Sequence, residues 1–227
     1  MNLLDKNPYI VVEGPIGAGK TSLSRRIAQY LDTDLLLEQA EENPFLTRFY
    51  REPKRYALAT QLFFLFQRST QLAEVRQNDL FRRALVADFL LDKDPLFAEL
   101  NLEGDEFRLY QTVYQQLRPQ TAKPDLVIYL QARPGILLER IRKRGITCEQ
   151  SISIDYLTRL TERYTHYFHH YENTPLLIVN CEQLDFVNDD VHFERLIQHV
   201  RDMRGAREFF NQSIGHQTPV WQQVCRQ

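Results

Sequence analysis

A glycine-rich stretch near the N-terminus has the residue types and the spacing that hold a triphosphate. The stretch Gly14-Pro15-Ile16-Gly17-Ala18-Gly19-Lys20-Thr21 fits the pattern G-x-x-x-x-G-K-[ST]. Its glycines let backbone N–H groups close around phosphate oxygens, and the start of the helix that should follow adds partial positive charge. Lys20 is expected to reach the β- and γ-phosphates, and the Thr21 hydroxyl is expected to face Mg²⁺. The loop and the neighbouring Ser22 therefore predict a site for a nucleoside triphosphate such as ATP.

Two carboxylates stand where short apolar runs end. Glu38 follows the run Leu35–Leu37, and Asp88 follows Leu85–Ala87. Ligands of open α/β sheets bind beyond the carboxyl ends of the strands, so both acids point into the phosphate crevice if these strands are neighbours. One acid could accept the proton of an acceptor hydroxyl, and another could lie near Mg²⁺. A single acid after a strand is common solubilising chemistry, but two beside a phosphate loop favour a function.

A long helical segment presents a third group of polar side chains. Gln61, Phe64 and Arg68 lie three and four residues apart and share one helix face. The amide of Gln61 offers a donor and an acceptor together, which suits the edge of a nucleobase. The helix alone is explained equally well by ordinary amphipathic packing.

These residues must be positioned by alternating strands and helices. The sequence predicts strands at Tyr9–Val12, Leu35–Leu37, Leu85–Ala87, Leu126–Leu130 and Leu176–Val179, and helices at Thr21–Leu31, Pro53–Gln77, Phe107–Leu117, Gly135–Arg144, Asp155–Tyr171 and Val191–Met203. Continuous apolar strands are typical of a parallel sheet that is covered on both faces. We expect one α/β domain over residues 1–227, a doubly wound sheet of about five parallel strands, with a core at about 8–205 and a tail at 206–227. The polar end of that tail, Phe209–Gln227, is expected to be a docking segment or a frayed terminus.

Composition excludes several classes of protein. The 28 Lys and Arg against 30 Asp and Glu give a net charge of −2, which argues against coating of DNA or RNA polymers. The three cysteines form no CxxC pair, which indicates a reducing compartment. We see no signal peptide and no run long enough for a membrane span, so a cytoplasmic protein without a membrane partner is expected.

The order of these motifs resembles the deoxynucleoside kinase family. The phosphate loop and Glu38 match, and Tyr50, Gln61 and Arg68 stand at the family spacing. The stretch Asp88–Ala98 is similar to the acid-led third-strand motif of bacterial members. Glu139–Gln150, followed by Tyr156-Leu157, is similar to the arginine-rich lid, so the resemblance spans roughly residues 8–205.

The resemblance implies a P-loop kinase that moves the γ-phosphoryl group of ATP, or another triphosphate, to the 5′-hydroxyl of a deoxynucleoside. It implies Glu38 as general base, with Lys20, Arg140 and Arg144 stabilising the transferred group and Thr21 and Asp88 near Mg²⁺. The sugar and base would be held by Tyr50, Glu149, Gln61, Arg68, Asp94, Asp88, Phe64 and Phe89. Bacterial relatives with this third-strand pattern favour purines, and family members are commonly homodimers.

Two positions depart from the family pattern. Phe89 follows Asp88 where an arginine is usual, and Gln39 follows Glu38 where a proline is usual. Arg48 and Arg51 are candidates to supply the missing charge. Two alternatives stay open: a nucleoside monophosphate kinase, whose second phosphate would be held by Arg48, Arg51 and Arg55, and a nucleotide-binding or assembly subunit of the same fold with little turnover.

Overall fold

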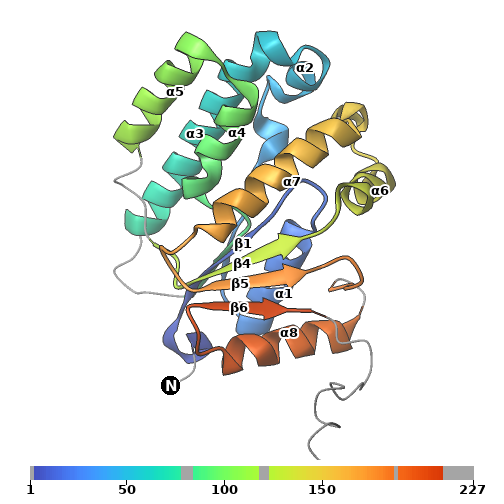
Figure 1. Ribbon diagram of the computed structural model, residues 1–227. Coiled ribbons are helices and arrows are strands. Elements are labelled where there is room, and N and C mark those ends of the chain that lie inside the picture. The colour runs from blue at the N-terminus through green and yellow to red at the C-terminus, as the bar shows by residue number, and fades with distance from the viewer. Residues whose placement is uncertain (1–2, 78–83, 118–122, 187–188, 212–227) are drawn as a thin grey trace, which may run out of the picture.

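The computed structural model describes residues 3–77, 84–117, 123–186 and 189–211, and they form a parallel sheet covered by helices on both faces (Figure 1). The sheet has six strands in the order β2-β3-β1-β4-β5-β6. The strands are β1 (Tyr9–Glu13), β2 (Asp34–Leu36), β3 (Leu85–Ala87), β4 (Leu126–Gln131), β5 (Leu176–Asn180) and β6 (Arg207–Phe210). Every neighbouring pair is parallel, with Val11 opposite Ala87 on one side and Val127 on the other.

The helices are divided between the two faces of the sheet (Figure 1). α1 (Lys20–Leu31) and α8 (Asp190–Asp202) cover one face. The other carries α3 (Pro53–Gln77), α4 (Asp94–Asn101), α5 (Gly104–Leu117) and α7 (Ile154–His169), while α2 (Leu46–Arg51) and α6 (Pro134–Arg144) lie near the carboxyl ends of the strands. Short 3-10 turns include η1 (Leu3–Lys6), η2 (Ala40–Glu42), η4 (Leu91–Lys93) and η6 (Thr147–Ser151). Within the described ranges, no helix is both long enough and apolar enough to cross a membrane.

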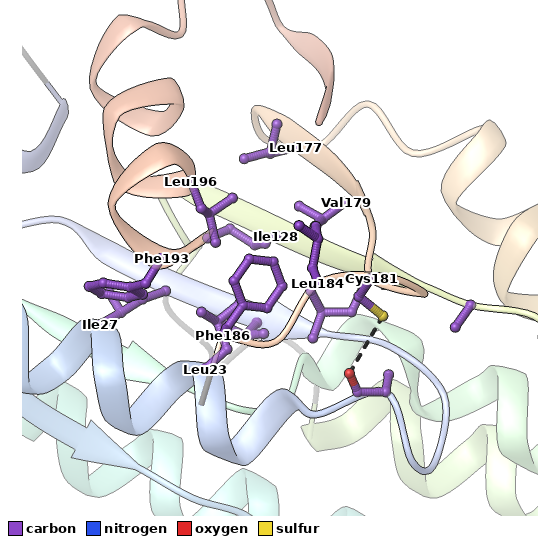
Figure 2. Close-up of a cluster of buried hydrophobic side chains, with 14 of the residues drawn as sticks. Leu23, Ile27, Ile128, Leu177, Val179, Cys181, Leu184, Phe186, Phe193 and Leu196 are labelled. Atoms are coloured by element: carbon purple, nitrogen blue, oxygen red, sulfur yellow. Dashed lines mark hydrogen bonds between the residues drawn. The ribbon is translucent and has the colours of Figure 1, made fainter. Parts of the chain in front are cut away.

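Side-chain alternation along the strands explains this layering. In β1, Ile10 and Val12 pack toward α1 and α8, whereas Val11 packs toward α7. The strand has apolar residues on both sides because both faces of the sheet are buried. Figure 2 shows the first of these cores, where Leu23 of α1 and Phe193 of α8 close over the sheet.

The predicted fold class and five predicted strands are confirmed, each strand within one residue of its predicted ends. Of the six predicted helices, five agree within two residues at either end, and one of these, α3, agrees at both ends. The sixth, α5, begins three residues early, at Gly104. Two short helices were not predicted, α2 and α4, because six to eight residues give too little periodicity to recognise. These two elements matter because both bring side chains toward the site.

No strand was predicted in the tail expected at 206–227, but Arg207–Phe210 at its start is a sixth strand, β6, which pairs with β5. Its sequence, REFF, lacks the continuous apolar run that predicts a central strand. β6 lies at the edge of the sheet, where polar side chains can reach solvent. Glu208 accepts the N–H groups of Arg204 and Gly205, both at 2.8 Å, and so shapes the turn before the strand. Residues 212–227, including Trp221, lie outside the described residues.

Candidate functional site

The predicted phosphate loop connects β1 to α1. Gly17 has a φ of +86°, and a Cβ added there would lie 2.7 Å from the carbonyl oxygen of Leu137, so only glycine fits. The Lys20 ammonium donates a hydrogen bond to the carbonyl of Gly14 at 2.9 Å and so reaches across the loop. The first turn of α1 holds no acidic residue, which leaves the positive end of the helix dipole unopposed. The loop therefore has the backbone and charge that a phosphate group needs.

The sheet order places the predicted carboxylates beside this loop, because β2, β3 and β1 are consecutive neighbours. Asp88 accepts a hydrogen bond from the Thr21 hydroxyl at 2.5 Å and another from the backbone N–H of Glu38 at 2.7 Å. Burial raises the pKa of Asp88, although both hydrogen bonds oppose that effect. Asp88 thus connects the phosphate-loop helix directly to the backbone of Glu38.

Glu38 belongs to a buried charge cluster with Arg68 and Asp94. The guanidinium of Arg68 forms ion pairs with both acids, and its side chain is 5% exposed. Burial alone would raise the pKa of Glu38, but Arg68, then Lys93 and Lys20, lower that pKa to about 2. Glu38 is therefore held as a carboxylate at every physiological pH.

Glu38 and Arg68 line a cavity of about 860 Å³, which we call the acceptor cavity. Its wall also includes Lys20, Thr21 and Asp88. The predicted sugar- and base-contacting residues Tyr50, Gln61, Phe64 and Glu149 line the same cavity. Tyr50 comes from α2 and Glu149 from η6, and these two elements pack against each other. Hence residues from separate parts of the chain face one cavity.

A second cavity, of about 450 Å³, lies on the other side of the phosphate loop, and we call it the donor cavity. It is lined by Gly17, Ala18, Gly19, Ser22, Leu23, Arg140, Lys143, Arg144 and residues 181–186. Arg140 donates to the carbonyl oxygen of Cys181 at 2.6 Å, and Arg144 pairs with Glu149. Gly17, Ser22 and Arg144 line both cavities, so the two spaces meet at the phosphate loop and the lid.

The end of β5 is tied to the phosphate loop beneath the donor cavity. The Cys181 thiol lies 3.6 Å from the carbonyl oxygen of Ala18, drawn as the dashed line in Figure 2. Cys181 is 1% exposed and packs with Leu184 and Phe186 in the core beside α1. The loop that follows β5 is thereby held against the floor of the cavity.

The structure does not bring every predicted residue to a cavity. Phe89 is fully buried among the side chains of α3 and α5, and it does not line the acceptor cavity. Asp94 lies behind Arg68 rather than on the cavity wall. Arg48 and Arg51, the candidates for the missing cation, are exposed and do not line the acceptor cavity, and Arg48 lies 5.8 Å from the ring of Tyr56, so their compensating role stays a prediction.

Sequence reasoning missed the buried pair of Glu13 and Lys93. Glu13 ends β1 as Asp88 ends β3, and this shared position was the available signal. Lys93 lies within the third-strand motif and lines the acceptor cavity. Phe97 and Tyr156 also line it; both belong to stretches that resemble family motifs, but no role was predicted for either.

Metal binding was tested against the donor atoms present. Within the described part of the chain, no group of three or more His, Cys, Asp or Glu side chains could hold an ion by itself. The Thr21 hydroxyl and the Asp88 carboxylate are hard oxygen ligands in mutual contact beside the phosphate loop. Mg²⁺ typically takes one or two protein oxygens together with substrate phosphates, so this pair fits such an ion.

Comparisons with known proteins agree with this geometry. The family model for deoxynucleoside kinases matches residues 10–204. A deoxyguanosine kinase of Bacillus subtilis is 33% identical over 201 residues, covering 86% of this chain and 97% of that protein. A deoxyadenosine kinase of Lactobacillus acidophilus is 33% identical over 195 residues, covering 79% and 88%.

A solved structure of a deoxyadenosine kinase from M. mycoides, with products dCMP and a flexible dCDP bound, superposes with a TM-score of 0.75. It is 25% identical in sequence and covers 86% of this chain and 100% of its own. The same enzyme with bound dATP gives a TM-score of 0.74. The sheet, the phosphate loop and the match over residues 10–204 lead to one conclusion: the chain belongs to the deoxynucleoside kinase family.

Proposed function

We propose that the protein transfers the γ-phosphoryl group of ATP to the 5′-hydroxyl of a purine deoxynucleoside. The observation that carries this proposal is the lining of the acceptor cavity, where Lys20 and Thr21 of the phosphate loop share one wall with Glu38. A nucleoside in this cavity and a triphosphate in the donor cavity would meet at Gly17 and Arg144, which line both. The reaction then depends mainly on positioning and charge stabilisation.

Glu38 is proposed to orient the 5′-hydroxyl and to accept its proton. Its ion pair with Arg68 keeps the carboxylate ionised, and its backbone N–H is fixed by Asp88. In phosphoryl transfer the protein needs to align the nucleophile more than to deprotonate it early, so an ionised carboxylate of low basicity suffices. Lys20, Arg140 and Arg144 are proposed to stabilise the charge on the transferred group.

Thr21 and Asp88 are proposed to hold Mg²⁺ together with the phosphates of ATP. The ion, when bound, neutralises charge that develops on the phosphate oxygens. The two side chains contact each other, and Asp88 also accepts the backbone N–H of Glu38. One carboxylate therefore serves both the donor side and the acceptor side.

The nucleoside is proposed to bind with its sugar at Tyr50 and Glu149 and its base at Gln61, Phe64 and Arg68. Within the described residues the Nε of Arg68 is buried without a hydrogen-bond partner, and its side chain lines the cavity. A purine offers ring nitrogens, or an exocyclic oxygen, that could accept this hydrogen. The names of the related proteins, a deoxyguanosine kinase and a deoxyadenosine kinase, support the choice of a purine.

A nucleoside monophosphate kinase is not favoured, because its acceptor would need cations to hold a second phosphate. Arg48, Arg51 and Arg55, the candidates for that task, are exposed and do not line the acceptor cavity. A subunit without turnover is not favoured either, since the loop, the carboxylates and the lid arginines lie together.

We also propose a cytoplasmic homodimer that joins through α3 and α5. These helices lie side by side at one end of the molecule (Figure 1). Each exposes a large apolar side chain, Phe66 on α3 and Leu109 on α5. Light scattering on the purified chain tests the dimer, and Phe66→Glu should shift it toward a monomer.

The activity is tested by a phosphorylation assay with ATP and Mg²⁺ over the four common deoxynucleosides, the corresponding ribonucleosides and the deoxynucleoside monophosphates. Deoxyguanosine and deoxyadenosine should give the highest kcat/KM, and Lys20→Ala should give the background rate. Product with monophosphates but not with deoxynucleosides would overturn the proposal. ATP binding without any product would do so as well.

A further inference from the structure

Glu13 is a fully buried acid that the proposed phosphoryl transfer does not use. It is the last residue of β1 and has no exposed surface. Its Oε1 accepts the N–H of Gly14 at 2.8 Å, and its Oε2 accepts the N–H of Leu90 at 2.9 Å. The same carboxylate accepts the Tyr164 hydroxyl at 3.0 Å and the Lys93 ammonium at 3.2 Å. These four contacts fix the position of the carboxylate inside the protein.

Two of these contacts connect segments that act on opposite substrates. Gly14 is the first residue of the phosphate loop, and Leu90 lies two residues after Asp88. Glu13 therefore joins the start of the donor-binding loop to the segment that carries the acid of β3. A buried carboxylate is stable only when its charge is balanced, so this link depends on a cation.

Lys93 supplies that cation. Its side chain is 2% exposed, and its ammonium lies 3.3 Å from the Tyr164 hydroxyl and 4.9 Å from the ring centre of Phe97. Burial, together with Glu13, raises the pKa of the Tyr164 hydroxyl, which therefore stays protonated as a donor. Nothing in the surroundings competes with Glu13 as the direct ionic partner of Lys93 among the described residues.

Lys93 also lines the acceptor cavity, where it is one of five cationic side chains among the described residues. Arg68 and Arg144 are paired with acids, Lys20 belongs to the phosphate loop, and Arg25 is exposed on α1. Phe89, directly after Asp88, is buried in an apolar cluster and brings no charge to the cavity. Lys93 belongs to η4, which follows β3, whereas the lid follows β4 on the other side of β1. It therefore reaches the acceptor cavity from the side opposite the lid.

From these contacts we propose that Lys93 is a positioning residue for phosphoryl transfer. Its ammonium pairs with the Glu13 carboxylate, which contacts both Gly14 of the phosphate loop and Leu90 after β3. Lys93 thereby fixes the position of the phosphate loop relative to the segment after β3. It also adds positive charge to the acceptor cavity. The role rests on the proposed function, because the relative position of the two segments matters for turnover only if a phosphoryl group is transferred from the donor cavity to the acceptor cavity.

The charge of Lys93 is sensitive to pH. Burial, reinforced by Arg68 and opposed by Glu13, lowers its pKa to about 8. The charged and titratable groups that face it come from several elements: Glu13 of β1, Tyr164 of α7, Arg68 of α3, Lys20 of α1, and Glu38 after β2. Because the pKa is lowered, the ammonium is charged below about pH 8 and is lost as the pH rises through that value.

The test compares pH profiles of kcat/KM between pH 6 and 10 for the wild type, Lys93→Arg and Lys93→Met. The wild type should lose activity near pH 8. Lys93→Arg should keep kcat within about fivefold at pH 7, and its decline should move up by at least one pH unit, because a guanidinium stays charged. Lys93→Met should lower kcat at least tenfold at pH 7. Lys54→Met, an exposed lysine of α3, is the matched control and should match the wild type.

Two results would overturn the proposal. One is a folded Lys93→Met that turns over within twofold of the wild type, and the other is an Arg variant whose decline stays at the wild-type pH. If the Met variant does not fold, the Arg profile still decides. A wild type that phosphorylates no deoxynucleoside refutes the proposed function instead. In that case ATP calorimetry tests the link itself: Lys93→Met should weaken ATP binding at least fivefold at pH 7, and unchanged binding would count against it.

Discussion

Removal of the Arg68 guanidinium should destabilise the fold strongly. Arg68 is the only cation that the structure pairs with Glu38 and Asp94 among the described residues, and their side chains are 19% and 1% exposed. In Arg68→Met the side chain keeps much of its length and fills much of the same space. The two carboxylates are then left facing each other without the charge between them.

The size of the loss follows by two routes. Breaking a buried ion pair by removing one partner costs about 3–5 kcal/mol. The pKa of Glu38 is lowered from 4.5 to about 2, which corresponds to about 3 kcal/mol at 1.36 kcal/mol per pH unit. We therefore expect a loss of about 3–5 kcal/mol in the free energy of unfolding at pH 7.

Urea unfolding measures this loss, with Arg55→Met as the control on the same helix. Arg55 pairs with Glu52 at 3.6 Å on the surface, where such pairs contribute about 0–1 kcal/mol. Because the pKa of Glu38 is lowered in the folded state, its stabilisation is full above pH 4.5 and is lost as the pH falls through about 2. The gap between wild type and Arg68→Met should narrow from pH 7 to pH 3. A loss below 1 kcal/mol at pH 7, or a gap that does not change with pH, would refute this reasoning.

Three further outcomes are expected. Glu38→Gln should lower kcat by about 10²–10⁴ and, because it removes the charge that pairs with Arg68, should also lower the free energy of unfolding at pH 7 by about 3 kcal/mol; full turnover would remove this residue as the base. Gly17→Ala should weaken ATP binding in calorimetry, because its Cβ would lie 2.7 Å from the carbonyl of Leu137, whereas Gly135→Ala meets nothing within 4 Å and should bind normally. Thr21→Val should raise the Mg²⁺ concentration needed for half-maximal rate, and an unchanged requirement would remove this hydroxyl from the metal site.

The sheet was predictable because each central strand is a continuous apolar run. A strand with apolar residues on both sides is stable only when both faces of the sheet are covered. The sequences of β1, β4 and β5 therefore predict that these strands are buried on both faces. β6 carries no such signal, because it lies at an edge and is positioned by two of its own side chains, Glu208, which accepts N–H groups of the preceding turn, and Arg207. That arginine donates to the carbonyls of His169 and Tyr171, both at 2.8 Å. Contacts of this kind join residues far apart in the chain, and local pattern cannot show them.

Site residues were predictable where an acid directly follows a predicted strand, and less so elsewhere. Glu38 and Asp88 lie where strand ends in a parallel sheet must lie, and the structure brings both into the acceptor cavity. Their roles stay predictions. The failure at Phe89 has a simple cause: a strand alternates its faces, so the residue after Asp88 points into the core on the α3 side.

Two buried carboxylates explain how one sheet edge can align two substrates. Glu13 fixes the first N–H of the phosphate loop, while Asp88 accepts from Thr21 at the other end of the loop and from the backbone of Glu38. The loop is thus attached at both ends to neighbouring strands, β1 and β3. Glu38 is attached to the same frame, so its distance from the phosphate loop is set by strand pairing and not by a flexible side chain. A change at Asp88 must therefore disturb both substrates at once, whereas a change at Gln61 should disturb only the nucleoside.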